Sequence, residues 1–267
     1  MVKYKLSILI PSWNGEKYIE NCIKSILDND YENYQIISIA GGIDQGYNLS
    51  KKLQEKEPNK IIALKQEKGG KNKALNQSIE IIDGDIIVIT DVDCIYPKHW
   101  LSNINEIFQE KKITVITGLN LPFQHHTNSL AEFNRIRGGY NLVNFPDGGI
   151  IVGNKLWGGN AAFRKEIFDK KIGKFEEVSK TGDDKILGME FNKQGEDLYF
   201  FRDIYVYTEQ YSSNLKYFIN HRIRWAKDLF IDLHKKDIPK LLFLLGIGLF
   251  KFFYPLLVLI GFSILNA

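Results

Sequence analysis

Two aspartates follow an apolar run in a pattern that could hold a metal ion. Asp91-Val92-Asp93 comes directly after Ile86–Thr90, a run typical of a buried strand. Paired carboxylates at a strand exit suit Mg²⁺ or Mn²⁺, which prefer oxygen ligands that substrate phosphates often complete. Short Asp-x-Asp pairs are also frequent by chance. The position after a strand makes Asp91 and Asp93 the candidate ligands of a Mg²⁺ or Mn²⁺ cofactor.

A glycine- and lysine-rich segment is the second candidate. Gly69–Asn76 reads GGKNKALN and precedes a helical pattern. Glycines permit close approach of the backbone, and a helix N-terminus beside Lys71 and Lys73 would attract phosphate groups. The alternative is a solvated loop with incidental lysines.

Two adjacent acids open an apolar stretch further along the chain. Asp183 and Asp184 follow Gly182. Acids are favoured in the first turn of a helix, so helix capping accounts for the pair on local grounds. A carboxylate in a crevice can also take a proton from a hydroxyl group, which would make this pair the source of a general base.

A basic and aromatic segment, His221–Trp225, lies within the amphipathic helical pattern of residues 214–233. Arg224 could bind phosphate oxygens through its guanidinium fork, and Trp225 could offer a stacking surface. The alternative is a membrane-proximal basic helix with an interfacial Trp. His125-His126 has no acid at ligand spacing and is interpreted as a structural or surface pair.

Strand and helix patterns alternate through the first half of the chain, which predicts an α/β fold with a mainly parallel sheet flanked by helices. The expected strands are residues 6–10, 35–40, 61–64, 86–90 and 114–119, and the expected helices are 18–27, 49–56, 74–82 and 100–108. Ligands of such sheets bind beyond the carboxyl ends of the strands. The polar segments 11–16, 41–44 and 91–93 fall at such ends, so we expect them to converge on one crevice.

The composition is that of a globular protein. Of 267 residues, 44% are hydrophobic and 25% are charged, which excludes disordered and collagenous classes. A formal charge of +3 does not indicate a nucleic-acid partner. Cys22 and Cys94 are too few for a disulfide framework or a cysteine-rich zinc site, so we expect buried thiols and a reducing compartment.

The C-terminal end predicts attachment to a membrane. From Leu241 to Leu265 the only formal charge is that of Lys251. A helix rising about 1.5 Å per residue would cover the roughly 30 Å of a bilayer core. Lys251 and Pro255 near its middle leave a single span, a kinked span, a re-entrant hairpin and an in-plane helix open, as well as a buried helix of a soluble protein.

Basic residues lie before this apolar segment, and only Asn266 and Ala267 follow it. The positive-inside tendency therefore predicts that the N-terminal part faces the cytoplasm. We see no signal peptide in the first residues. The expected organisation is a catalytic domain over residues 1–235 and a membrane-associated segment over residues 236–267, with no internal repeat or linker between them.

The order of these motifs resembles the family 2 glycosyltransferases, which have the GT-A fold. Ser7–Glu16 is similar to the opening strand and nucleotide-contacting turn of the family, and Gly70–Asn76 to its Gly-Lys…Ala-Leu-Asn element. Asp91-Val92-Asp93 resembles the Asp-x-Asp motif, and Gly159–Glu166 the acceptor-side segment. Gly182–Asp184 resembles the acidic pair whose second member is the base.

His221–Trp225 resembles the Gln-x-x-Arg-Trp motif of the membrane-bound branch that includes hyaluronan, chitin and cellulose synthases, with His221 in the place of Gln. The family usually ends its second strand with Asp-Asp-Gly-Ser, in which an acid contacts the base or ribose. The corresponding segment here is Ile39–Asp44, so Asp44 is the candidate for that contact.

The resemblance implies an inverting, metal-dependent hexosyltransferase at the cytoplasmic face of a membrane. It would move a sugar from a nucleoside diphosphate sugar, with a UDP-sugar as the first expectation, to a glycan or lipid-linked acceptor. Asp184 is implied as the base, and Asp91 and Asp93 as metal ligands. The implied nucleotide-sugar contacts are Pro11, Ser12, Trp13, Asn14, Glu16, Gly42, Asp44, Lys71 and Asp91. The implied acceptor or diphosphate contacts are Gly159, Asn160, Asp183, His221, Arg224 and Trp225.

Two other functions remain open at this stage. A catalytically silent sugar-nucleotide-binding subunit of a membrane glycan-assembly complex would explain the altered end of the second strand. A nucleotidyltransferase would explain the Asp91–Asp93 pair and the lysines, but it leaves Gly182–Asp184 and Arg224-Trp225 without a role.

Overall fold

The computed structural model describes residues 2–123, 146–151, 156–177 and 183–208, together with Ile219 and Ile223. The chain divides into two compact units, Met1–Ser213 and Asn214–Ala267, and every helix and strand named below lies in the first. The domain boundary expected at residue 235 stays a prediction. Within the described ranges no helix is both long and apolar enough to cross a membrane. The apolar segment 241–265 lies outside those ranges.

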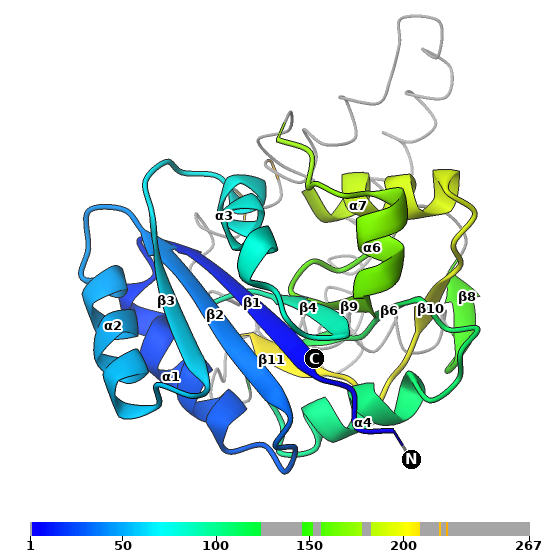
Figure 1. The fold of residues 1–267 in the computed structure, drawn as a ribbon, viewed down its shortest axis with the longest axis horizontal. Coiled ribbons are helices and arrows are strands. Elements are labelled where there is room, and N and C mark those ends of the chain that lie inside the picture. The colour runs from blue at the N-terminus through cyan, green and yellow to red at the C-terminus, as the bar shows by residue number, and fades with distance from the viewer. Residues whose placement is uncertain are drawn as a thin grey trace, which may run out of the picture. The chain divides into compact units, whose positions relative to one another are not determined.

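An eight-stranded sheet with the order β3-β2-β1-β4-β9-β6-β10-β8 forms the centre of the first unit (Figure 1). The strands β3, β2, β1 and β4 pair in parallel, whereas β9 runs antiparallel to both β4 and β6. The mainly parallel sheet predicted from the sequence is therefore confirmed. Its strands are β1 (Leu6–Trp13), β2 (Tyr34–Gly41), β3 (Ile61–Gln66), β4 (Ile86–Thr90), β6 (Val115–Thr117), β8 (Gly149–Ile151), β9 (Asn160–Arg164) and β10 (Leu198–Phe200). A smaller sheet contains β5 (Cys94–Ile95), β7 (Asn120–Pro122) and β11 (Val206–Thr208).

Helices cover both faces of the large sheet because its strands are apolar on both sides. Ile8 and Ile10 of β1 belong to a core cluster with α1, α2 and α4, whereas Leu9 belongs to a second cluster with α3, α6 and α7. The opposite directions of neighbouring side chains along a strand produce this division. The helices are α1 (Glu16–Leu27), α2 (Gly46–Lys56), α3 (Lys71–Ser78), α4 (Trp100–Ile107), α6 (Lys165–Lys171) and α7 (Asp183–Lys193), and a 3₁₀ turn at Ile79–Ile81 follows α3.

The first strand is longer than the sequence predicted. We expected Pro11 to end it, but β1 pairs with β2 as far as Trp13 opposite Gly41. The pairing of β1 with β4 stops at Leu9 opposite Ile89. Because Pro11 has no backbone N–H, it is tolerated where β1 has lost one neighbour. The polar end of β1 therefore extends beyond the point at which its pairing with β4 stops.

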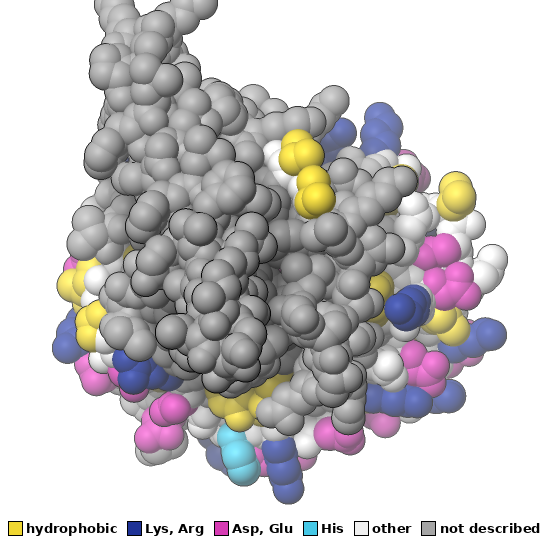
Figure 2. Space-filling view, turned by 180° about the vertical axis from the view of Figure 1, so that it is seen from behind, with side chains coloured by type: hydrophobic (Ala, Val, Ile, Leu, Met, Phe, Trp, Pro, Cys, Tyr) yellow, Lys and Arg dark blue, Asp and Glu magenta, His cyan; other side chains and the backbone are white. Residues whose placement is uncertain are grey.

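Charged side chains of both signs are interspersed on the described surface seen from behind (Figure 2). Elsewhere in the described chain, ion pairs one helical turn apart include Lys24–Glu20 and Lys165–Asp169. Exposed pairs of this kind contribute little to stability.

The Arg164 side chain connects the C-terminal end of β9 to the segment after α4. It is only 7% exposed, and its guanidinium donates to the carbonyls of Ile113 (3.0 Å), Phe108 (2.7 Å) and Glu110 (3.3 Å). The same group lies 5.3 Å from the ring centroids of Tyr4 and Phe108. The register of β9 places Arg164 opposite Ile86, at the end of the sheet remote from Asp91. Arg164, which lies in the segment that resembles the acceptor side, therefore has a structural role.

We predict that Arg164→Met lowers the free energy of unfolding by about 2–4 kcal/mol, because two buried carbonyls and one partly buried carbonyl lose a charged donor. Urea denaturation would measure the change. The matched control is Lys165→Met, which removes only a partly exposed pair with Asp169 and is expected to cost less than about 0.5 kcal/mol. Equal stability of the two variants would contradict the role given to Arg164.

Candidate active site

The ends of β1 and β2 are joined by an asparagine and a glycine in unusual conformations. Asn14 has φ 55° and Gly42 has φ 113°. The backbone N–H of Asn14 donates to the Gly41 carbonyl (2.9 Å). The side-chain oxygen of Asn14 accepts from the Ile43 N–H (2.8 Å). A Cβ on Gly42 would lie 2.1 Å from that oxygen, so only glycine fits. These contacts fix the two strand ends side by side.

Asp44 and Glu16 hold the first turns of the two following helices together. One Asp44 oxygen accepts from the Glu16 N–H (2.8 Å) and the other from the Gly46 N–H (3.1 Å). Glu16 in turn accepts from the Gln45 N–H (3.0 Å). Unpaired N–H groups at helix starts are satisfied in this way. Asp44 is therefore a turn-forming residue, and its contact with a nucleotide stays a prediction.

Trp13 offers an aromatic face at the end of β1. Its side chain is 45% exposed, and a Cβ on Gly69 would lie 3.3 Å from the ring, which places the ring against this glycine. The Gln66 amide donates to the carbonyls of Lys68 (2.7 Å) and Gly70 (2.9 Å) and so shapes the loop that leads into α3. Pro11 and Ser12, by contrast, are buried. Of these predicted nucleotide contacts, Trp13 presents the largest free surface.

Buried hydroxyl groups fix the backbone around Asp91. The Tyr96 hydroxyl donates to the Asp91 carbonyl (3.1 Å), and Thr90 contacts Tyr96 and donates to the Gly159 carbonyl (3.1 Å). Burial raises the pKa of Tyr96 well above its usual value, so its hydroxyl stays protonated and available as a donor. The turn after β4 is thereby fixed in one conformation.

Both cysteines are buried, as expected from the sequence. The Cys22 thiol lies 3.9 Å from the Asp91 carbonyl, and Cys94 lies 3.7 Å from the Thr208 hydroxyl. Burial raises the pKa of Cys94, and the neighbouring Asp93 and Asp91 carboxylates raise it further. This thiol is therefore neutral, unlike a reactive thiolate.

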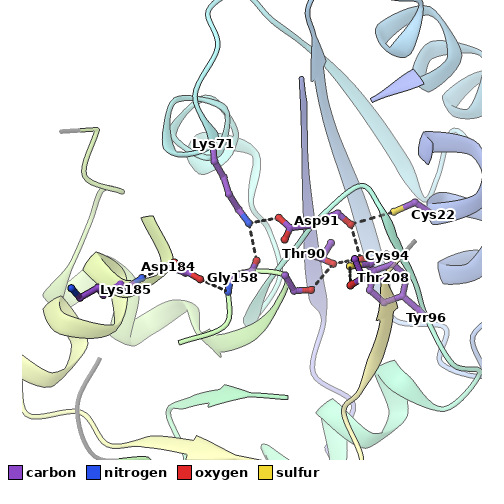
Figure 3. A network of polar contacts seen from close by, with 11 residues as sticks. Cys22, Lys71, Thr90, Asp91, Cys94, Tyr96, Gly158, Asp184, Lys185 and Thr208 are labelled. Carbon is purple, nitrogen blue, oxygen red and sulfur yellow. Dashed lines mark hydrogen bonds and ion pairs between the residues drawn. The ribbon is translucent and has the colours of Figure 1, made fainter. Parts of the chain in front are cut away.

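A chain of polar contacts connects Asp91 to Asp184 (Figure 3). The Lys71 ammonium donates to Asp91 and to the Gly158 carbonyl (2.9 Å), and the Gly158 N–H donates to the Asp184 carboxylate (3.2 Å). Burial lowers the pKa of Lys71, but pairing with Asp91 and the charges of Asp184 and Asp183 offset this, so the pKa is raised. Lys71 is therefore a cation between the two carboxylates.

Two glycines make this close approach possible. A Cβ on Gly158 would lie 2.8 Å from the Cβ of Asp184, and a Cβ on Gly159 would lie 2.7 Å from an Asp91 oxygen and 2.5 Å from the Asn120 amide nitrogen. Sequence reasoning predicted Gly159 but missed Gly158 and Asn120. The signal available was the Gly158-Gly159 pair itself, because adjacent glycines permit close approach of other groups to the backbone.

We predict that Gly158→Ala lowers the rate of transfer by about tenfold to a hundredfold, because the new methyl group displaces the Asp184 carboxylate. Donor affinity measured by calorimetry is expected to stay close to that of the wild type. Gly195→Asn is the control, because Gly195 has φ 80° with nothing within 4 Å and Asn tolerates this conformation. An unchanged rate for Gly158→Ala would show that the Gly158 contact does not position Asp184.

Asn160 was predicted to contact the acceptor, but it lies in the core. It is 1% exposed, it accepts from the Trp100 indole N–H (3.1 Å), and it donates to the carbonyls of Leu119 (3.1 Å) and Ile204. These hydrogen bonds occupy the side-chain amide of Asn160 inside the core. Its position therefore gives no support to a contact with an acceptor.

Asp183 and Asp184 both lie in the first turn of α7 and are partly buried. One Asp184 oxygen accepts from the Lys185 N–H (2.9 Å) and the other from Gly158. Helix capping and a role in the site are therefore compatible for Asp184. The predicted residues Gly182, His221, Arg224 and Trp225 lie outside the described residues.

The Asp91–Asp93 turn fits a divalent cation whose coordination is completed by a ligand. The Asp91 side chain is 41% exposed and Asp93 is partly exposed, and both offer the hard oxygen atoms that Mg²⁺ and Mn²⁺ prefer. In the part of the chain that the structure describes, no three His, Cys, Asp or Glu side chains gather as a metal site. Phosphate oxygens and water commonly complete the coordination of such cations.

Comparisons with known proteins agree with this architecture. The family model described as "Glycosyltransferase like family 2" matches residues 4–227. The glycosyltransferase GlyG of Streptococcus pneumoniae is 30% identical over 114 residues, 42% of this chain, and the chain spans only 38% of that relative. A Methanococcus voltae enzyme named dolichyl N-acetyl-alpha-D-glucosaminyl phosphate 3-beta-D-2,3-diacetamido-2,3-dideoxy-beta-D-glucuronosyltransferase is 28% identical over 247 residues, 85% of this chain and 74% of its own.

A solved structure shows the same fold. The mannosyltransferase PcManGT of Pyrobaculum calidifontis, in complex with GDP-Man and Mn²⁺, superimposes with a TM-score of 0.67 at 17% identity, covering 88% of this chain and 66% of that one. The fold is therefore GT-A-like. Because the family model matches residues 4–227, most of the chain, this chain belongs to the family 2-like glycosyltransferases.

Proposed function

We propose that this glycosyltransferase moves a sugar from a nucleoside diphosphate sugar to a glycan or lipid-linked acceptor in one metal-dependent, inverting displacement. The observation that carries the proposal is the contact chain from Asp91 through Lys71 and Gly158 to Asp184. It puts the candidate metal-binding carboxylate and the candidate base on opposite sides of one small polar site. A single-displacement transferase needs both groups in one site.

Asp184 would take the proton from the acceptor hydroxyl as that oxygen attacks the anomeric carbon. The bond from carbon to the diphosphate oxygen breaks at the same time, and the nucleoside diphosphate leaves. The Gly158 N–H fixes the orientation of Asp184 for this transfer. Asp91 and Asp93 would hold Mg²⁺ or Mn²⁺, which when bound supplies positive charge to the leaving diphosphate. Lys71, which pairs with Asp91, would add a protein cation beside the same diphosphate.

The donor would lie across the ends of β1, β2 and β4. The exposed face of Trp13 suits a flat nucleobase. Asn14, the next residue, connects the ends of β1 and β2 through its hydrogen bond with the Ile43 N–H. A UDP-sugar is the first donor to test, and the GDP-Man of the Pyrobaculum structure makes GDP-sugars the second.

Features outside the described site support the proposed acceptor and location. The name of the Methanococcus relative includes a dolichyl phosphate-linked sugar, which supports a lipid-linked acceptor here. The apolar segment 241–265 would keep the catalytic unit on the cytoplasmic face of a membrane. Arg224 and Trp225 would contact the diphosphate and the acceptor from the segment before it. Retention of the full chain in the membrane pellet after an alkaline carbonate wash would test this location.

A donor screen tests the proposal as a whole. Detergent-solubilised full chain is incubated with UDP-, GDP-, dTDP- and CMP-sugars, with Mn²⁺, Mg²⁺ or EDTA, and with a membrane lipid extract as acceptor, and nucleotide release is followed. We expect release from one nucleoside diphosphate sugar that stops in EDTA. Release from no donor, with or without the extract, would contradict the proposal.

A further inference from the structure

We infer that Lys71 and the divalent cation compete for the Asp91 carboxylate, so that the cation binds tightly only together with a nucleoside diphosphate. The inference rests on the proposed function and adds to it an order of binding and the residue that enforces it. Lys71 then acts as an internal counter-ion of the site in addition to any contact with phosphate.

One oxygen of the Asp91 carboxylate already accepts from the Lys71 ammonium. The other lies beside Gly159, which has no side chain, and the Asp91 side chain is 41% exposed, so a cation has access to it. A divalent cation bound there would share the negative charge of the carboxylate with Lys71 and would repel the nearby ammonium. Binding of the cation alone therefore favours displacement of Lys71.

Displacement is unfavourable unless Lys71 gains a new partner. Its side chain is only 24% exposed, and it is held by the Gly158 carbonyl (2.9 Å) and by the charges of Asp183 and Asp184 as well as by Asp91. A partly buried ammonium that lost its main carboxylate would be poorly solvated, and the incoming divalent cation would repel it.

A nucleoside diphosphate removes this penalty. Its phosphate oxygens offer the ammonium new anionic partners and offer the divalent cation the ligands that Asp91 and Asp93 cannot supply. Nucleotide and cation therefore favour each other's binding, and by linkage the effect is reciprocal. Without Lys71 this dependence should weaken, because Asp91 would then lack its internal cation.

Mn²⁺ binding measured by electron paramagnetic resonance tests the inference without any turnover. Full chain is titrated with Mn²⁺ alone and in the presence of UDP or GDP. For the wild type we expect an affinity for Mn²⁺ at least about tenfold higher with the nucleotide, about 1.4 kcal/mol. Lys71→Met should bind Mn²⁺ alone at least about tenfold more tightly than the wild type does. Lys65→Met, a change of an exposed lysine on β3, should match the wild type.

Two further results decide the origin of the effect. Adding Asp91→Asn to Lys71→Met should abolish the gain in affinity, and Lys71→Gln serves if the Met variant does not fold. Equal Mn²⁺ affinity of the wild type with and without nucleotide, or no gain in either Lys71 variant, would overturn the inference while leaving the proposed transfer intact. Absence of Mn²⁺ binding with every nucleotide would instead contradict the metal site of the proposed function, and the inference with it.

Discussion

Replacing Asp184 with Asn is expected to lower the rate of sugar transfer by about 10²–10⁴-fold, the range that a positioned general base contributes. The amide keeps an oxygen that can accept from the Gly158 N–H, so the side chain should stay in place. It cannot take a proton from the acceptor hydroxyl. Donor affinity should therefore remain near that of the wild type while the turnover number falls.

Initial rates with saturating donor, together with calorimetric donor binding, check this expectation. Asp169→Asn provides the control, because Asp169 lies on α6 in a partly exposed pair with Lys165. Transfer at the wild-type rate by Asp184→Asn would rule out Asp184 as the base. Loss of donor binding together with activity would show that the residue supports the donor site instead.

Replacing Asp93 with Ala is the second change with a large expected effect. A cation on a transferring group supplies several kcal/mol of charge stabilisation, and about 1.4 kcal/mol corresponds to tenfold in rate. We therefore expect transfer to fall by at least about a hundredfold, with a matching loss of Mn²⁺ affinity in the presence of nucleotide.

The rate of nucleotide release at increasing Mn²⁺ concentrations measures this effect. Asp83→Asn is the matched control: Asp83 precedes β4 at its opposite end and pairs with Lys5 on the surface (2.5 Å). If Asp93→Ala keeps the metal dependence of the wild type, Asp93 is not a ligand of the cation.

Local sequence signals predicted most of the parallel half of the sheet. Apolar runs bounded by glycine or polar residues identified β1 to β4, because strands buried on both faces need continuous apolar residues. The same signals located the polar strand ends around Asn14, Asp44 and Asp91, since parallel strands bring their carboxyl ends to one edge. The extension of β1 through Pro11 was missed because it depends on where β4 stops pairing.

The contacts that complete the site are set by residues far apart in the sequence. Lys71, Asp91, Gly158 and Asp184 meet only when β9 inserts antiparallel beside β4, and no local pattern announces that pairing. Asn160 and Arg164 illustrate the same limit. Their motif pointed to the acceptor, but tertiary packing uses their polar atoms for the carbonyls of other elements.

The stereochemistry of the product tests the central claim, a single displacement with Asp184 as base, most directly. Once the donor screen has identified a donor of known anomeric configuration, the linkage formed is determined by proton NMR from the coupling constant of the transferred sugar. The account predicts an inverted linkage, so that an α-linked donor gives a β-linked product. A retained configuration would require two displacements or a front-face reaction and would contradict the role assigned to Asp184.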